Sequence, residues 1–557
     1  MRRSGLLRLA AILAALSLAP PPFASAALAD TLIDNVDGFT LDREGQVQRL
    51  SGLLIGNDGR ILQVLHRGDK RPARADYLLD GKGRVLMPGL VDAHAHVMAL
   101  GFSALSLDLG PARTLAEAQA RLAAYAAAHP DRPWIMGSGW DADAWGLSRA
   151  LTAADLDAVV SDRPVWLVSA DGHSGWANSA ALVAAGIAGT GKDLPGGRIE
   201  RVAGKPTGLL TEAAVDLVAR AAPAPRPEDR DLAFSAAQDA LLKQGVTAVT
   251  DVGTTIEDWQ AYRRAGDLGT LRLRVLAYAA GTEAMALIGG PGPSPWLYAD
   301  ALRLNGVALP IDGMLATRGA LLKTAYADAP GQTGLPRQPE TALRNLMSRG
   351  AIDRFQILAV AHGDKALATA IAAFAELAQT YKGDRRWRID GAEVVDPADL
   401  AKLPGNGIVG AIVPTALDPA TAEKRLGPDR LTGVQPWAAL GKAGPLALGS
   451  GAASGAGLKP WTAIAVATTR QPVDGQPYGG WQPQERLTRE QALAAATAGA
   501  AWAAFADGHF GRLEVGQRAD FLLLDRDPLL ASPAELRDTR VLETWVGGRR
   551  VWAAPER

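Results

Sequence analysis

The sequence predicts an α/β protein: a (β/α)8 TIM barrel with insertions plus a small β-sandwich domain formed from both chain termini. Apolar runs of strand length alternate with Ala-rich helical stretches through the middle of the chain, which is typical of parallel βα units. Both ends instead carry short apolar runs separated by Asn-Asp-Gly and Asp-Gly turns, which indicate β-hairpins. We therefore expect the β domain at residues 30–88 and 509–557 and the barrel at 89–508.

The composition limits which ligands and which metal-binding side chains the protein can use. The chain has 557 residues, 58 Lys+Arg against 59 Asp+Glu, and a net charge of -1. This balance argues against a nucleic-acid-binding protein, which needs a basic face. The chain has no cysteine, which excludes disulfides, thiolate zinc sites and cysteine nucleophiles. Any metal must be held by carboxylates and by the 7 histidines.

Residues 1–29 have the pattern of a signal peptide. Arg2, Arg3 and Arg8 precede an apolar stretch at 9–18 that is too short to span a bilayer, and small residues near 24–29 offer a cleavage site. We expect an exported protein, periplasmic or secreted, that starts near Asp30; an uncleaved anchor is the alternative. The arginine pair is a poor twin-arginine match. No later segment is predicted to span a membrane, and the oligomeric state is left open.

The expected elements follow the chain in order. N-terminal strands are predicted at 53–55, 61–65, 77–79 and 85–87, and C-terminal strands at 521–524, 541–546 and 551–552. Barrel-type strands are predicted at 165–168, 246–249, 271–276, 357–360, 408–413 and 446–448. Helices between them are expected at 115–129, 229–243, 366–380 and 489–504.

The most informative motif is a His-x-His at the end of an apolar strand. The segment 88–96 reads Pro-Gly-Leu-Val-Asp-Ala-His-Ala-His, so His94 and His96 lie two positions apart. The strand period of two places both imidazoles on one face, about 6–7 Å apart. At the C-terminal end of a first barrel strand that face points into the mouth, where active sites lie. Two neutral imidazoles there can share a divalent metal, commonly zinc.

This motif and others make the chain resemble the amidohydrolase superfamily, in particular its "amidohydrolase 3" branch, which includes N-substituted formamide deformylases. Further matching segments are 171–179, 245–248, 312–313, 363–364, 388–389, 425–428, 449–450, 511–520 and 544–548. The resemblance implies hydrolysis of non-peptide, amide-like C–N bonds by a metal-activated water. It also implies four metal-site positions besides His-x-His: a Lys or Glu, two histidines, and an Asp as general base.

The sequence departs from the family at those four positions. They are held by Ala308, Val360, Gly391 and Gly451. His362 lies two residues after Val360, so strand parity could still direct it to the mouth as a third metal ligand; alternatively it caps the strand. Because glycine leaves space, restoring Gly391→His together with Gly451→Asp is expected to be tolerated sterically.

Two hypotheses follow. The first is an exported hydrolase with a divalent metal, preferably zinc, held by His94, His96 and His362. The second is a pseudoenzyme that keeps the barrel and binds a small ligand or partner. In both, Asp171, His173, Asp312 and Arg318 are candidate substrate-binding residues, because they lie in segments that resemble the family's pocket. Glu212, Asp251 and Asp364 are candidate substitute bases near predicted strand ends.

Overall fold

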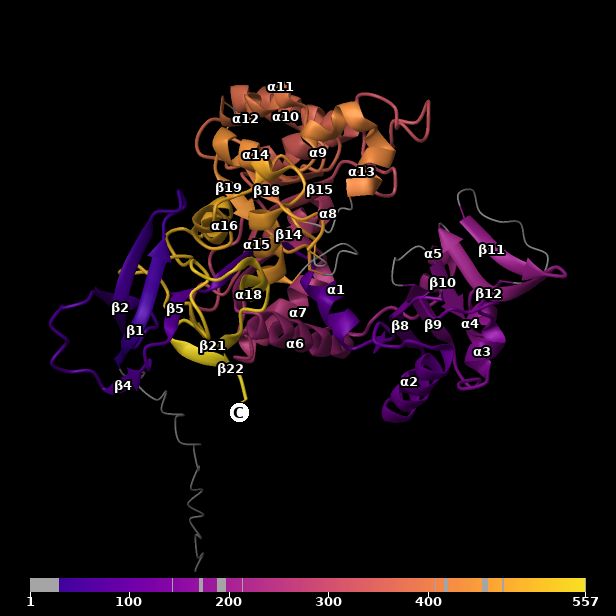
Figure 1. Ribbon diagram of the computed structural model, residues 1–557, viewed down its shortest axis with the longest axis horizontal. Helices are drawn as coiled ribbons and strands as arrows, with labels where there is room; N and C mark the ends of the chain where they lie inside the picture. The colour runs from indigo at the N-terminus through magenta and orange to yellow at the C-terminus, as the bar shows by residue number, and fades with distance from the viewer. Residues whose placement is uncertain are drawn as a thin grey trace, which may run out of the picture.

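The computed structural model describes residues 30–142, 144–169, 174–187, 197–212, 214–405, 407–414, 419–452, 459–472 and 475–555. The predicted signal peptide therefore lies outside the described residues. The chain forms a central barrel, a β domain beside it and an inserted lobe on the opposite side (Figure 1). No helix within the described ranges is both long and apolar enough to cross a membrane.

The barrel consists of eight parallel strands, which confirms the predicted fold class. In chain and sheet order these are β6 (Leu90–Ala95), β13 (Val246–Thr254), β14 (Arg274–Ala280), β15 (Leu302–Pro310), β16 (Gln356–Ala361), β17 (Arg388–Gly391), β18 (Val409–Ile412) and β19 (Leu446–Leu448). Past β19 the chain returns to β6: the amide of Gly451 donates to the carbonyl of His94 (2.9 Å), and that of His96 donates to Ala452 (3.0 Å). The barrel therefore closes beside the His-x-His motif.

Helices pack around the barrel because their buried faces are apolar. They are α6 (Pro227–Lys243), α7 (Ile256–Asp267), α8 (Gly281–Gly289), α9 (Glu340–Ile352), α10 (Asp364–Thr380), α14 (Trp437–Ala443), α15 (Pro460–Thr469), α16 (Arg489–Ala495) and α17 (Ala498–Ala503). Further helices are α11 (Pro397–Leu400), α12 (Lys402–Gly405), α13 (Pro419–Leu426) and α18 (Pro533–Arg537). In α10 the buried residues recur at helical spacing, from Ala366 through Phe374 to Leu377, as expected for a helix that covers a strand.

The β domain is assembled from both ends of the chain. One sheet joins β1 (Thr31–Leu41), β2 (Val47–Ile55), β3 (Ile61–Leu65), β4 (Tyr77–Asp80) and β5 (Val85–Pro88) to β20 (Phe521–Leu524), β21 (Val541–Val546) and β22 (Arg549–Ala553). The join is an antiparallel pairing of β5 with β20. A buried ion pair attaches this domain to the barrel: Arg274 of β14 contacts Asp520 through Nε (2.5 Å) and Nη2 (2.8 Å).

The inserted lobe corrects part of the sequence analysis. We assigned 165–168 and 115–129 to the alternation of barrel strands and helices, but they form β9 (Val165–Ser169) and α2 (Leu115–Ala128) of a separate six-stranded sheet. Its other strands are β7 (Leu107–Asp108), β8 (Ile135–Trp140), β10 (Ser174–Ala177), β11 (Gly197–Val202) and β12 (Lys205–Glu212). Its further helices are α3 (Ala153–Asp157), α4 (Ser179–Ala184) and α5 (Val215–Ala219). The lobe follows α1 (Val97–Ala104) and has its own apolar core. Because its strands and helices alternate as those of the barrel do, the sequence pattern did not distinguish it from the barrel.

Candidate active-site cavity

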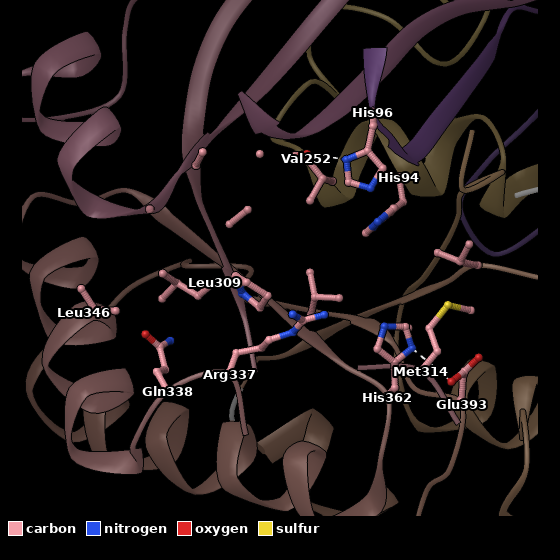
Figure 2. Close-up of a pocket in the computed structure, with 18 residues that line it drawn as sticks. His94, His96, Val252, Leu309, Met314, Arg337, Gln338, Leu346, His362 and Glu393 are labelled. Carbon is pink, nitrogen blue, oxygen red and sulfur yellow. Dashed lines mark hydrogen bonds and ion pairs between the residues drawn. The ribbon is translucent and has the colours of Figure 1, made fainter. Parts of the chain in front are cut away.

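A cavity of about 570 Å³ opens at the carboxyl ends of the barrel strands. Its walls are mainly apolar, and six polar side chains face it: His94, His96, Arg337, Gln338, His362 and Glu393. Figure 2 shows the His94–His96 pair on one side of this space and His362 with Glu393 on the other. A cavity in this place is where TIM-barrel proteins bind their substrates.

The end of strand β6 brings the two histidines of the motif together, as the strand period predicts: His94 lies in the strand and His96 follows its last residue. Their ring centroids lie 5.5 Å apart, with the ring planes at 88° to each other. Nδ1 of His96 lies 2.7 Å from the carbonyl oxygen of Val252. Since a carbonyl can only accept, Nδ1 carries the proton and Nε2 of the neutral ring holds the lone pair. Burial, together with the neighbouring His94, lowers the pKa of His96 and keeps the ring neutral at pH 7.

His94 is held in the same way by a carboxylate. Its Nδ1 lies 2.8 Å from Oδ2 of Asp390, on β17. Asp390 also accepts from the guanidinium of Arg388, at 3.1 Å from Nε and 2.8 Å from Nη2, and neither of these two side chains is exposed. His94 therefore also donates from Nδ1 and keeps its Nε2 atom for a ligand.

Three of the four positions that differ from the family pattern also face this cavity. Ala308, Val360 and Gly391 line it beside the two histidines. A methyl group, an isopropyl group and a hydrogen atom offer no donor to a metal. The sites predicted from the family pattern therefore lie at the cavity wall, with side chains that cannot act as ligands.

The glycines at 391 and 451 adopt backbone conformations that disfavour other residues. Their φ angles are +101° and +66°. A Cβ atom at Gly391 would also lie 3.1 Å from the carbonyl oxygen of Ala361 and 3.2 Å from the ring of His362. We expected Gly391→His together with Gly451→Asp to be tolerated sterically because glycine leaves space, but these φ angles strain any residue with a Cβ whatever the space.

His362 lies in the cavity, opposite the His-x-His motif, and is paired with a carboxylate that sequence analysis missed. Its Nδ1 atom is 3.3 Å from Oε2 of Glu393, which also accepts from the amide of Leu315 at 2.9 Å. Burial lowers the pKa of His362, but the Glu393 carboxylate outweighs it and raises the pKa overall. Burial has the opposite effect on Glu393, whose pKa is lowered overall by His362. Glu393 lies two positions past Gly391, where β17 has ended and Ala392 has a positive φ, so strand alternation gave no signal for it.

The residues present do not fit a three-ligand metal centre. Within the part of the chain that the structure describes, no three His, Asp or Glu side chains converge as ligands. His94 and His96 each present one Nε2 atom, whereas His362 faces Glu393. Catalytic zinc sites generally use three protein ligands, so we derive no reaction step through a metal.

The other candidate residues lie elsewhere. Asp312 and Arg318 are absent from the cavity wall. The Asp312 carboxylate accepts from the amides of Leu321, His362 and Gly363 at 2.7–2.9 Å, which holds the loop after β15. Arg318 pairs with Asp328. Asp171 and His173 lie outside the described residues.

Two of the candidate substitute bases are engaged in structural hydrogen bonds. Asp251 accepts from the amide of Val97 (2.9 Å) and from the hydroxyls of Thr254 (2.7 Å) and Tyr262 (2.8 Å). Asp364 accepts from the amide of Lys323 at 2.8 Å. The side chain of Glu212 lies outside the description. Neither Asp251 nor Asp364 lines the cavity.

A barrel with His-x-His at the end of its first strand, and a β domain built from both termini, defines a TIM-barrel protein with a composite second domain. Comparison with known proteins gives the family. The profile of the amidohydrolase family matches residues 78–552. The chain therefore belongs to the amidohydrolase family, in its "amidohydrolase 3" branch.

Individual relatives are similar to this chain over nearly the full length of both proteins. Protein LONG AFTER FAR-RED 3 of Arabidopsis thaliana is 31% identical, over 96% of this chain and 93% of its own. N-substituted formamide deformylase of Arthrobacter pascens is 27% identical, over 93% of this chain and 97% of its own. A metal-dependent hydrolase from Pyrococcus furiosus has a TM-score of 0.74 at 26% identity, covering 90% of this chain and 100% of its own.

Proposed function

We propose that this chain is a member of the amidohydrolase family that binds a small molecule in the barrel cavity and has lost metal-centred hydrolysis. One observation carries the proposal: Ala308, Val360 and Gly391 face the same cavity as the two histidines. The family places donors at these positions, and here the side chains have none. Two imidazoles alone hold zinc weakly.

The position of the general base supports the same reading. Gly451 stands where the family has its aspartate, and a hydrogen atom cannot accept a proton. Glu393 is the one carboxylate among the described residues of the cavity wall. It is already engaged by His362 and by the amide of Leu315. No carboxylate on this wall is therefore free to activate water.

The cavity remains suited to an amide-like ligand. Its walls are mainly apolar, and the rings of His94 and His96 both turn their Nε2 atoms toward a ligand. The neutral ring of His96 presents an Nε2 lone pair that can accept from an N–H group. Because each ring is fixed through Nδ1, both Nε2 atoms are already oriented before a ligand arrives.

A second candidate function is hydrolysis of a non-peptide C–N bond. The specific observation that favours it is the intact His-x-His pair, because anchored Nδ1 atoms and open Nε2 atoms are the arrangement that metal-binding histidines use. Family membership and the similarity to N-substituted formamide deformylase point the same way.

The metal content of the purified protein distinguishes ligand binding without a metal from metal-dependent hydrolysis. The protein, purified without chelator, is incubated with zinc, desalted and measured by elemental analysis alongside His96→Ala. We expect far less than one metal ion per chain in both. About one ion per chain that disappears in His96→Ala would overturn the proposal and favour hydrolysis. His129→Ala is the control, since His129 stacks on Tyr125 in the inserted lobe.

We also propose that the protein is exported, on the basis of the charged, apolar and small-residue segments within residues 1–29. N-terminal sequencing of the protein recovered from a bacterial periplasm should begin near Asp30. Recovery from the cytoplasm with Met1 retained would contradict export.

A further inference from the structure

Among the described residues that line the cavity, Arg337 is the one strongly charged group whose side chain has no hydrogen bond or ion pair with the protein. His94, His96 and His362 each face an acceptor, and Glu393 faces His362. Among the described residues, no hydrogen bond or ion pair involves the Arg337 guanidinium, although it lines the cavity. Figure 2 shows its side chain reaching from the wall toward the middle of the cavity, on the side of His362.

The backbone fixes the position from which Arg337 reaches inward. Its amide donates to the carbonyl of Ile311 at 2.7 Å, which ties it to the residue directly after β15. Pro336 and Pro339 flank it, and Pro339 is the N-cap of α9. Proline restricts the backbone on both sides. The cation is therefore presented by a restrained segment.

We propose that Arg337 is an anion-recognition site and that the ligand of this cavity carries a carboxylate on an apolar body. A guanidinium presents a planar pair of N–H donors that matches a carboxylate in bidentate fashion. Beyond it, side chains such as Leu309, Leu346 and Val413 offer only apolar contacts. The histidine acceptors lie on the opposite wall. One ligand can thus place its carboxylate at Arg337 and its N–H group at His94 or His96.

This inference rests on the proposed binding function and names its ligand class. The probes are phenylacetate and phenylacetamide, which share shape and differ in charge at pH 7. Each is titrated into the full-length protein by calorimetry, at low and high salt. We expect phenylacetate to bind more tightly than phenylacetamide. Arg337→Ala should weaken phenylacetate on the order of 10–100-fold and leave phenylacetamide unchanged.

Two further variants sharpen the test. Arg337→Lys keeps the positive charge but loses the planar pair of N–H donors. It should therefore bind phenylacetate more tightly than Arg337→Ala and more weakly than the unmodified protein. Arg349→Ala is the matched control, because Arg349 pairs with Asp353 at the end of α9 and is not part of the cavity wall. It should bind phenylacetate like the unmodified protein.

The outcomes separate this inference from the proposed function. If both probes bind equally and Arg337→Ala changes neither, the carboxylate site is overturned while ligand binding by the cavity stands. If neither probe binds to the unmodified protein, the carboxylate site is also overturned. One zinc per chain in the metal measurement would overturn the proposed loss of the metal centre without bearing on Arg337.

Discussion

The Nδ1 atom of His94 lies 2.8 Å from Oδ2 of Asp390, although 296 positions separate the two residues in the chain. The contact crosses the barrel from β6 to β17. Asp390 is fixed in turn by Arg388, which also donates to the carbonyl of Ala93 at 2.7 Å. A cavity histidine, a buried carboxylate and a buried guanidinium thus form one network.

Replacing Asp390 by asparagine should destabilise the protein by about 3–5 kcal/mol, because Arg388 would remain buried without its counter-charge. The same change leaves only one acceptor oxygen at position 390, which Arg388 and His94 must share, and so weakens the contact that orients His94. Urea unfolding measures the first effect, and calorimetric titration with phenylacetamide measures the second.

Asp520→Asn provides the matched control. It breaks another buried pair, with Arg274, where both side chains are 2% exposed, but that pair lies between the barrel and the β domain. A similar loss of stability is expected, with phenylacetamide binding unchanged. A destabilisation of Asp390→Asn below about 1 kcal/mol would contradict a charged, fully engaged Asp390.

Alanine at Gly391 or Gly451 should destabilise the protein by about 1–2 kcal/mol each, since the φ angles of +101° and +66° are unfavourable for a residue with a Cβ. Chemical denaturation of the single variants measures this. Gly405→Ala serves as the control because a Cβ there meets no atom within 4 Å and the residue lies in helix α12. Equal stability of all three variants would show that the two backbone conformations are not strained.

These glycines also show how far the sequence could predict the site. The strand period placed His94 and His96 together correctly, because parity along one strand is a local property. Gly391 could be aligned with a family histidine, but its φ depends on how β17 ends. The consequence for substitution therefore required the structure.

Other parts of the site depend on contacts between distant segments. Arg337 comes from a loop, and loops carry no periodicity that would direct a side chain inward. Asp390 is visible in the sequence beside Arg388, whereas its contact with His94 follows only from barrel closure. The inserted lobe was not recognised as a separate unit because its apolar strands alternate with helices in the same sequence pattern as those of the barrel.

Acid stability offers a test of the loop that carries Arg337. Arg318 contacts Asp328 at 2.8–3.1 Å, and Arg425 contacts the same carboxylate. The hydrogen bonds from Arg318, followed by Arg425, lower the pKa of Asp328 to about 2, from an ordinary value of 3.8. A lowered pKa in the folded state means that the stabilisation is complete above about pH 4 and is lost as the pH falls toward 2.

Asp328→Asn should therefore lower the free energy of unfolding by about 1–2 kcal/mol at pH 7, less than the full linkage value because the Arg318 side chain is 36% exposed. Urea unfolding at a series of pH values should show the difference from the unmodified protein shrinking below about pH 4. Glu340→Gln, which removes an exposed pair with Arg344, should cost less than about 0.5 kcal/mol. A difference for Asp328→Asn that stays constant down to pH 2 would mean that the carboxylate is not held by the two arginines.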